Sequence, residues 1–159
     1  MFKKILVANR GEIAVRIIRA CKELNIKTVA IHSNVDTEAM HVKLADESIC
    51  VGSALPNGSY LNIPSIISAI EITGADAVHP GYGFLSENDK FSKILNSHKV
   101  KFIGPSSKSI LELGNKSNAL NLASDFGLPI LGDKNSKNIE NTSEAQKKAF
   151  EIGLPIVIK

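Results

Sequence analysis

Two short segments combine residue types that could hold a small ligand. Asn9-Arg10-Gly11-Glu12 separates an apolar run from a helical pattern, which is where open α/β sheets usually bind ligands, and Gly11 permits a tight turn there. The second segment, 79–88, places a glycine on each side of Tyr82, so its backbone could approach a ligand closely. Each also has a purely structural interpretation: a tight turn for the first, and for the second an exposed Tyr82 and a Glu87 that complements the dipole of a helix beginning at Ser86.

Charged side chains at other positions could act on a phosphate or on a second protein. Lys116 opens a helical segment and Lys159 closes an apolar strand, where a lysine often meets phosphate, although either could lie on the surface. Arg16, Arg19 and Glu23 recur at helical spacing. They form either a solvated face with an internal ion pair or a contact with a twofold-related copy.

Arginine is rare and clustered in this chain. There are sixteen lysines but only three arginines, and all three lie between positions 10 and 19. Because arginine supplies planar bidentate donors that lysine lacks, the cluster either marks a site that needs such a donor or arises by chance.

Composition excludes several functional classes. The net charge of +3 is small and scattered and tryptophan is absent, so we expect no nucleic-acid partner. No stretch approaches the roughly 18 apolar residues of a membrane span. Cys21 and Cys50 lack metal or disulfide spacing, which favours the reducing cytosol. Neither GxGxxG nor GxxxxGK[ST] occurs, so neither a dinucleotide fingerprint nor a P-loop is supported.

The elements that must position these residues alternate between short β-branched runs and helical patterns. We predict a Rossmann-like α/β fold, with a parallel open sheet and helices on both faces. The predicted strands are 5–8, 27–32, 48–51, 76–78 and 100–103. The predicted helices are 12–24, 37–44 with Asp36 as its cap, one beginning at 62–64, and 87–96.

A change of pattern at 104–107 is the best candidate for a domain boundary. Beyond it we predict helices at 107–113, 116–126 and 143–152, a polar loop at 133–142 and a strand at 155–159. A strand that ends the chain calls for a sheet partner, which indicates a fragment.

Several segments together resemble the opening of biotin carboxylases and other biotin-dependent carboxylases. They span nearly all of residues 3–116 in the order and spacing of that family, thin out over 129–142, and resume at 153–159. The matching segments are 5–14, Arg16, 19–20, 41–47, 59–64, 79–88 and 102–105.

The resemblance implies an ATP-grasp enzyme and its partners. ATP would activate bicarbonate as carboxyphosphate, with Mg²⁺, and CO₂ would pass to N1 of biotin on a biotin carboxyl carrier protein. Residues 1–113 would form the Rossmann-like domain before the ATP-grasp domain, and 114–159 the incomplete start of that domain. A cytoplasmic homodimer working with carboxyltransferase subunits is expected.

The same resemblance implies roles for eight residues. Lys116 and Lys159 would bind ATP. The loop that faces biotin would contain Tyr82, Gly83 and Glu87. The homodimer interface would contain Arg16, Arg19 and Glu23.

The chain also departs from the pattern of the family. Asn115 stands where an aspartate is usual, and Leu131 where a proline is usual. The glycine-rich lid, the paired glutamates that hold Mg²⁺ and the basic residues that hold bicarbonate would follow Lys159. We therefore expect no catalytic or metal-binding residue within the chain, and no ATP turnover by the chain alone.

Three interpretations stay open at this point. The first is the biotin carboxylase of an acetyl-CoA carboxylase, in fatty acid synthesis, or the same domain of a propionyl-CoA, methylcrotonyl-CoA, pyruvate or urea carboxylase. The second is a non-catalytic dimerisation module. The third is another ATP-grasp ligase, such as a carbamoyl-phosphate synthetase or a purine-pathway enzyme, in which we would not expect the segment 79–88.

Overall fold

The structure is a computed structural model that describes residues 1–130, 141–153 and 155–156. By its internal contacts the chain forms two compact units, Met1–Leu111 and Glu112–Lys159, and each is described by itself. No helix in the described part of the chain combines the length and the apolar character needed to cross a bilayer.

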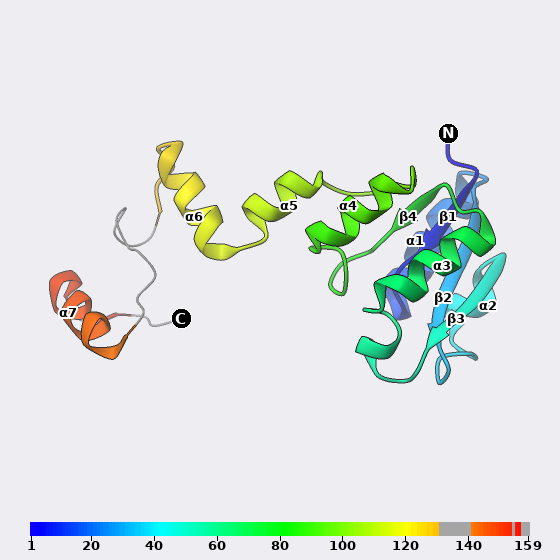
Figure 1. Cartoon of the computed structure of the whole chain (residues 1–159), viewed down its shortest axis with the longest axis horizontal. Helices are drawn as coiled ribbons and strands as arrows, with labels where there is room; N and C mark the ends of the chain where they lie inside the picture. The colour runs from blue at the N-terminus through cyan, green and yellow to red at the C-terminus, as the bar shows by residue number, and fades with distance from the viewer. Residues whose placement is uncertain (131–140, 154, 157–159) are drawn as a thin grey trace. The chain divides into compact units, whose positions relative to one another are not determined.

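The first unit is built on a five-stranded parallel sheet, as predicted. The strands run in the order β3-β2-β1-β4-β5. Figure 1 labels the first four strands of the sequence, β1 to β4. Their bounds are β1 Lys4–Val7, β2 Lys27–Ser33, β3 Glu47–Gly52, β4 Ala77–His79 and β5 Lys101–Phe102. Strand β1 lies in the middle, where Val7 pairs with Ala30 on one side and with His79 on the other. A strand buried on both faces needs an uninterrupted apolar run, which explains the sequence of β1.

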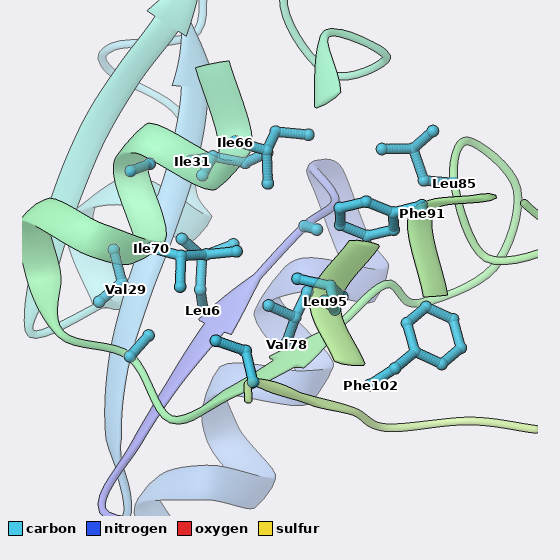
Figure 2. Packing of buried hydrophobic residues seen from close by; sticks show 14 of the residues in the cluster. Leu6, Val29, Ile31, Ile66, Ile70, Val78, Leu85, Phe91, Leu95 and Phe102 are labelled. Carbon is cyan, nitrogen blue, oxygen red and sulfur yellow. The ribbon is translucent and has the colours of Figure 1, made fainter. Parts of the chain in front are cut away.

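Helices cover both faces of the sheet, which confirms the predicted layering. Ile5 packs in one hydrophobic cluster with Ile18 of α1 (Gly11–Glu23). Leu6 packs in the other with Ile70 of α3 (Ile63–Thr73) and Leu95 of α4 (Asp89–Ser97), as Figure 2 shows. The two clusters arise because successive strand residues point to opposite faces. The other helix that lies wholly in this unit is α2 Met40–Leu44, and a 3₁₀ turn, η1, lies at Pro56–Gly58. Helix α5 Ser107–Leu113 begins in this unit, and its last two residues belong to the second.

The predicted start of the fourth helix is wrong by two residues. Helix α4 begins at Asp89, because the side chain of Asn88 accepts a hydrogen bond from the backbone N–H of Phe91 and so caps the helix. Ser86 and Glu87 lie in the preceding turn. Glu87 therefore does not occupy the first turn of a helix.

The predicted helix 37–44 is also wrong in its start and its cap. Helix α2 begins only at Met40 and has no side-chain cap. The carboxylate of Asp36 is engaged elsewhere: it accepts hydrogen bonds from Tyr60 Oη at 2.6 Å and from Ser33 Oγ at 2.8 Å. Because Asp36 is bound to Tyr60, 24 residues further along the chain, it does not cap the helix as its place in the sequence had indicated.

The second unit contains the predicted helices α6 Lys116–Asp125 and α7 Thr142–Ile152. Each begins after an asparagine whose side chain accepts backbone N–H groups, Asn115 and Asn141 respectively. None of the described residues of this unit is buried. Most of the predicted loop 133–142 and of the predicted strand 155–159 lies outside the described residues.

Candidate functional site

The two ligand-type segments of the sequence meet at the carboxyl edge of the sheet. After β1 the chain crosses to β2 and β3 on one side, whereas β4 and β5 lie on the other side. The loops that follow β1 and β4 therefore begin side by side, at the switch point where open α/β sheets bind ligands.

Asn9 ties these two loops together. Its buried side chain donates from Nδ2 to the carbonyl oxygens of Pro80 at 2.7 Å and Tyr82 at 2.9 Å. Gly81 lies between them with a φ of +66°, and a Cβ there would come within 2.8 Å of Asn9 Nδ2. A glycine is thus required at 81 both by the backbone angle and by the approach of Asn9.

His79 shapes the same loop from the end of β4. Its Nδ1 accepts a hydrogen bond from the backbone N–H of Gly81 at 3.1 Å. Burial lowers the pKa of His79, which favours the neutral ring that can accept this bond.

Tyr82 spans the edge of the switch point. Its ring is 61% exposed, and its hydroxyl donates a hydrogen bond to the carboxylate of Glu12 at the start of α1. Gly83 has a φ of +68° and open space around its Cα, and Glu87 lies exposed in the turn beyond it. The structure thus places Tyr82 and Gly83 at an accessible edge, next to the loop after β1.

A second set of contacts at this edge was not predicted from the sequence. The guanidinium of Arg10 lies 5.5 Å from the ring centroid of Tyr60 and 6.0 Å from that of Phe84, and its Nη1 lies 3.4 Å from Asp36 Oδ2. The hydrogen bond from Tyr60 lowers the pKa of Asp36, and burial raises the pKa of Tyr60 to about 12. Of the three clustered arginines only Arg10 makes these contacts, whereas Arg16 and Arg19 line a groove along α1.

The charged stripe of α1 borders a groove of about 810 Å³. Arg16, Arg19 and Glu23 line it together with residues of α2, among them His41. The ring of His41 is buried and donates from Nε2 to the carbonyl of Ile31 at 3.2 Å, and burial lowers its pKa. The described residues show no Arg19–Glu23 ion pair. The internal ion pair that the sequence offered as one interpretation of these charges therefore does not form.

The two predicted ATP lysines belong to the second unit. Lys116 is the first residue of α6, and the Asn115 side chain before it accepts the backbone N–H groups of Ser117 and Asn118. Asn115, which stands where an aspartate is usual, therefore caps helix α6. Lys159 lies outside the described residues. Within the described part of the chain, no group of three or more His, Cys, Asp or Glu side chains could hold a metal ion.

The family model for the biotin carboxylase N-terminal domain matches residues 1–110. The chain belongs to the biotin carboxylase family. Biotin carboxylase 1 of Bacillus subtilis is 49% identical over 159 residues, which are all of this chain and 35% of that protein. The mitochondrial propionyl-CoA carboxylase alpha chain of Homo sapiens is 50% identical over 158 residues, 99% of this chain and 22% of that protein. The chain thus spans about a third or less of the length of these relatives.

Solved biotin carboxylase structures share the fold. A biotin carboxylase–β,γ-ATP complex from Campylobacter jejuni superposes with a TM-score of 0.91 at 45% identity, covering 98% of this chain and 34% of that one. The biotin carboxylase domain dimer of the 2-oxoglutarate carboxylase of Hydrogenobacter thermophilus, in complex with MgADP, ADP and bicarbonate, gives a TM-score of 0.90 at 45% identity, with the same coverage.

Proposed function

We propose that this chain is the N-terminal part of an enzyme that uses ATP and bicarbonate to carboxylate biotin on a carrier protein. The observation that carries the proposal is the joined pair of loops at the switch point, where Asn9 holds the loop after β4 by hydrogen bonds of 2.7 and 2.9 Å. In this proposal Tyr82, Gly83 and Glu87 belong to the loop that faces biotin. The bicarbonate and MgADP bound by the Hydrogenobacter thermophilus domain support these ligand classes.

The residues that we propose for binding ATP belong to the second unit. There Lys116 at the start of α6 and Lys159 would bind ATP, and residues 114–159 would begin an ATP-grasp domain. Mg²⁺ would neutralise charge on the phosphates during phosphoryl transfer. The described residues form no acidic cluster for a metal ion, so we propose that the remainder of the whole protein supplies the Mg²⁺ and bicarbonate ligands.

The finer proposal is the biotin carboxylase subunit of a cytoplasmic acetyl-CoA carboxylase, acting with a biotin carboxyl carrier protein and carboxyltransferase subunits in fatty acid synthesis. Five bacterial relatives named biotin carboxylase match 99 to 100% of the chain, which supports it. Because the human propionyl-CoA carboxylase chain is equally similar, the acyl acceptor needs a direct test. The test uses a full-length chimaera in which this chain replaces the matching segment of the Bacillus subtilis enzyme. A bacterium with a temperature-sensitive biotin carboxylase should grow at the restrictive temperature when it expresses this chimaera.

The proposed activity is tested in vitro with the same chimaera, in which the matching segment of the Bacillus subtilis enzyme is replaced by this chain. We expect bicarbonate-dependent ADP release with free biotin within about tenfold of the parent enzyme. The 159-residue chain alone should release no ADP. A folded but inactive chimaera would contradict the proposed function, and ADP release by the chain alone would contradict its dependence on the rest of the protein.

The groove along α1 supports a second role as a homodimer interface. We propose that Arg19 of one copy meets Glu23 of the other across a twofold axis, with Arg16 beside them. In sedimentation equilibrium, Arg19→Glu and Glu23→Arg should each shift the chain towards the monomer, and the double charge swap should restore the dimer. A dimer that forms normally but binds no nucleotide even within the chimaera would favour a non-catalytic assembly module.

A further inference from the structure

The loop after β4 is held by two consecutive residues of the loop that follows β1. Asn9 binds the backbone of its first half, through the carbonyls of Pro80 and Tyr82. Arg10 lies against its second half, with the guanidinium 6.0 Å from the ring centroid of Phe84. Resting on the proposed function, we propose that Arg10 is a positioning residue that fixes this loop, and with it Tyr82 and Gly83, for binding biotin.

The first argument is the backbone of Phe84. Its φ is +42°, a conformation that a residue with a bulky side chain adopts only when surrounding contacts offset the conformational energy. The neighbouring contacts are the stacked ring of Tyr60, with a centroid distance of 5.4 Å and an interplanar angle of 14°, and the guanidinium of Arg10. Removing either contact should release the loop.

The second argument is that Arg10 is itself held in place. Asp36 Oδ2 lies 3.4 Å from Arg10 Nη1 and accepts the hydroxyl of Tyr60 at 2.6 Å. Tyr60 is fully buried and also accepts the backbone N–H of Ser33, at the end of β2. The contacts therefore form a continuous chain from the end of β2, through Asp36, Tyr60 and Arg10, to Phe84.

The third argument is the residue type. A guanidinium is planar and weakly hydrated, so it can contact two aromatic rings while one of its N–H groups faces a carboxylate. The ammonium of lysine is a compact, strongly hydrated charge and makes this contact poorly. In a chain with sixteen lysines and three arginines, an arginine at position 10 fits this demand.

The direct test measures the loop itself in the 159-residue chain. The backbone N–H of Ser86 donates to the carbonyl of Gly83 at 2.9 Å within the loop, whereas that of Ala8 donates to His79 at 2.9 Å beside the sheet. By NMR hydrogen exchange we expect Arg10→Lys to accelerate exchange of the Ser86 amide about fivefold and to leave the Ala8 amide unchanged, since a cation–π contact of this kind is modest in strength.

Two further variants control for charge and for folding. Arg10→Gln and Lys22→Gln each remove one positive charge from the exposed surface near α1, and only the first should accelerate exchange at Ser86. If Arg10→Lys lowers the melting temperature, Phe84→Leu removes the ring at the other end of the contact and should reproduce the acceleration. Exchange at Ser86 within twofold of wild type in Arg10→Lys and Phe84→Leu would overturn the inference, as would equal acceleration at Ala8.

The functional test uses the chimaera. Arg10→Lys should raise the KM for free biotin about fivefold and leave the KM for ATP unchanged. A rise in both constants by the same factor would indicate a merely structural role and overturn the proposal. If the unsubstituted chimaera is inactive, the proposed function fails, but the exchange experiment still decides whether Arg10 fixes the loop.

Discussion

At the scale of single residues, the carboxylate of Asp46 and the imidazoles of His79 and His41 make hydrogen bonds close to the ends of strands. Asp46, just before β3, accepts the backbone N–H and the hydroxyl of Thr28 at 2.9 Å each, and Lys27 Nζ at 2.8 Å. These hydrogen bonds, led by that from Lys27, lower the pKa of Asp46 to about 2. Because Lys27 is 70% exposed, the bonds to Thr28 should contribute most of the stability.

Asp46→Asn should lower the free energy of unfolding by about 1–2 kcal/mol at pH 7, since charge-assisted hydrogen bonds are lost. The folded pKa lies below the ordinary 3.8 of aspartate, so this contribution is complete above about pH 4 and disappears as the pH falls towards 2. Urea denaturation of the wild-type chain and of Asp46→Asn between pH 7 and pH 2 measures the difference in their free energies of unfolding. A gap that does not close in acid would contradict this account.

His79 and His41 should make stability depend on pH near neutrality. Burial lowers both pKa values, so the folded state favours the neutral rings. Their contribution is complete above the unfolded value of about 6.5 and is lost as the pH falls below it. Urea denaturation at pH 7.5 and 5.5 should show the loss, and NMR titration should give a midpoint below 6.5 for each ring.

The variant His79→Asn separates the two histidines. Asparagine can still accept the N–H of Gly81 but does not titrate in this range. We expect the variant to retain only the part of the pH dependence that comes from His41. A pH dependence identical to that of the wild-type chain would show that His79 contributes none of it.

The residues of the switch point were only partly predictable. Gly11 and Tyr82 were identified because glycines and an aromatic residue stand out in loops after strands. The contacts of Arg10 could not be predicted from the sequence. Its partners Asp36, Tyr60 and Phe84 come from three separate segments, and only the folded sheet brings them together.

At the scale of elements, asparagine caps decide where four helices begin. The side chains of Asn62, Asn88, Asn115 and Asn141 each accept a backbone N–H in the first turn that follows. This satisfies a donor that would otherwise lack a partner within the helix.

Asn88→Ala should therefore lower the free energy of unfolding by about 1 kcal/mol. Asn96→Ala, the same change on the exposed face of the same helix, α4, should be neutral or slightly stabilising because alanine has the higher helix propensity. Thermal or urea denaturation of the two variants tests the cap directly. Equal effects of the two substitutions would mean that the side chain of Asn88 contributes nothing at the helix start.

Element types were predictable where hydrophobic periodicity was strong. The continuous apolar run of β1 and the helical spacing of α1 led to correct predictions. The starts of α2 and α4 were missed because a start depends on which of several polar side chains caps the helix. Asp36 is occupied by Tyr60, 24 residues further along, and local sequence does not reveal this.

At the scale of the whole molecule, the two units differ in how much they bury. The first has hydrophobic clusters on both faces of its sheet, whereas no described residue of the second is buried. Helices shorter than about 12–15 residues without tertiary packing are marginally stable in water. The described helices of the second unit therefore gain little stability from burial.

Limited proteolysis of the 159-residue chain should cut within residues 112–159 first and leave a resistant fragment close to Met1–Leu111. A chain truncated after Leu111 should melt within about 2 °C of the full chain, since it keeps both hydrophobic clusters. Mass spectrometry of the digest and differential scanning calorimetry provide the measurements. First cleavage within the sheet would contradict this division of stability.

The central place of β1 has a consequence for synthesis on the ribosome. One edge of this strand can pair with β2 early, but its other edge must wait for β4, because Ile5 pairs with Ala77. At roughly 5–20 residues per second, translation leaves the backbone groups of that edge without a partner for about 4–14 s. An open strand edge is a template for misassembly, so pauses in translation before residue 77 should increase co-translational aggregation of the nascent polypeptide.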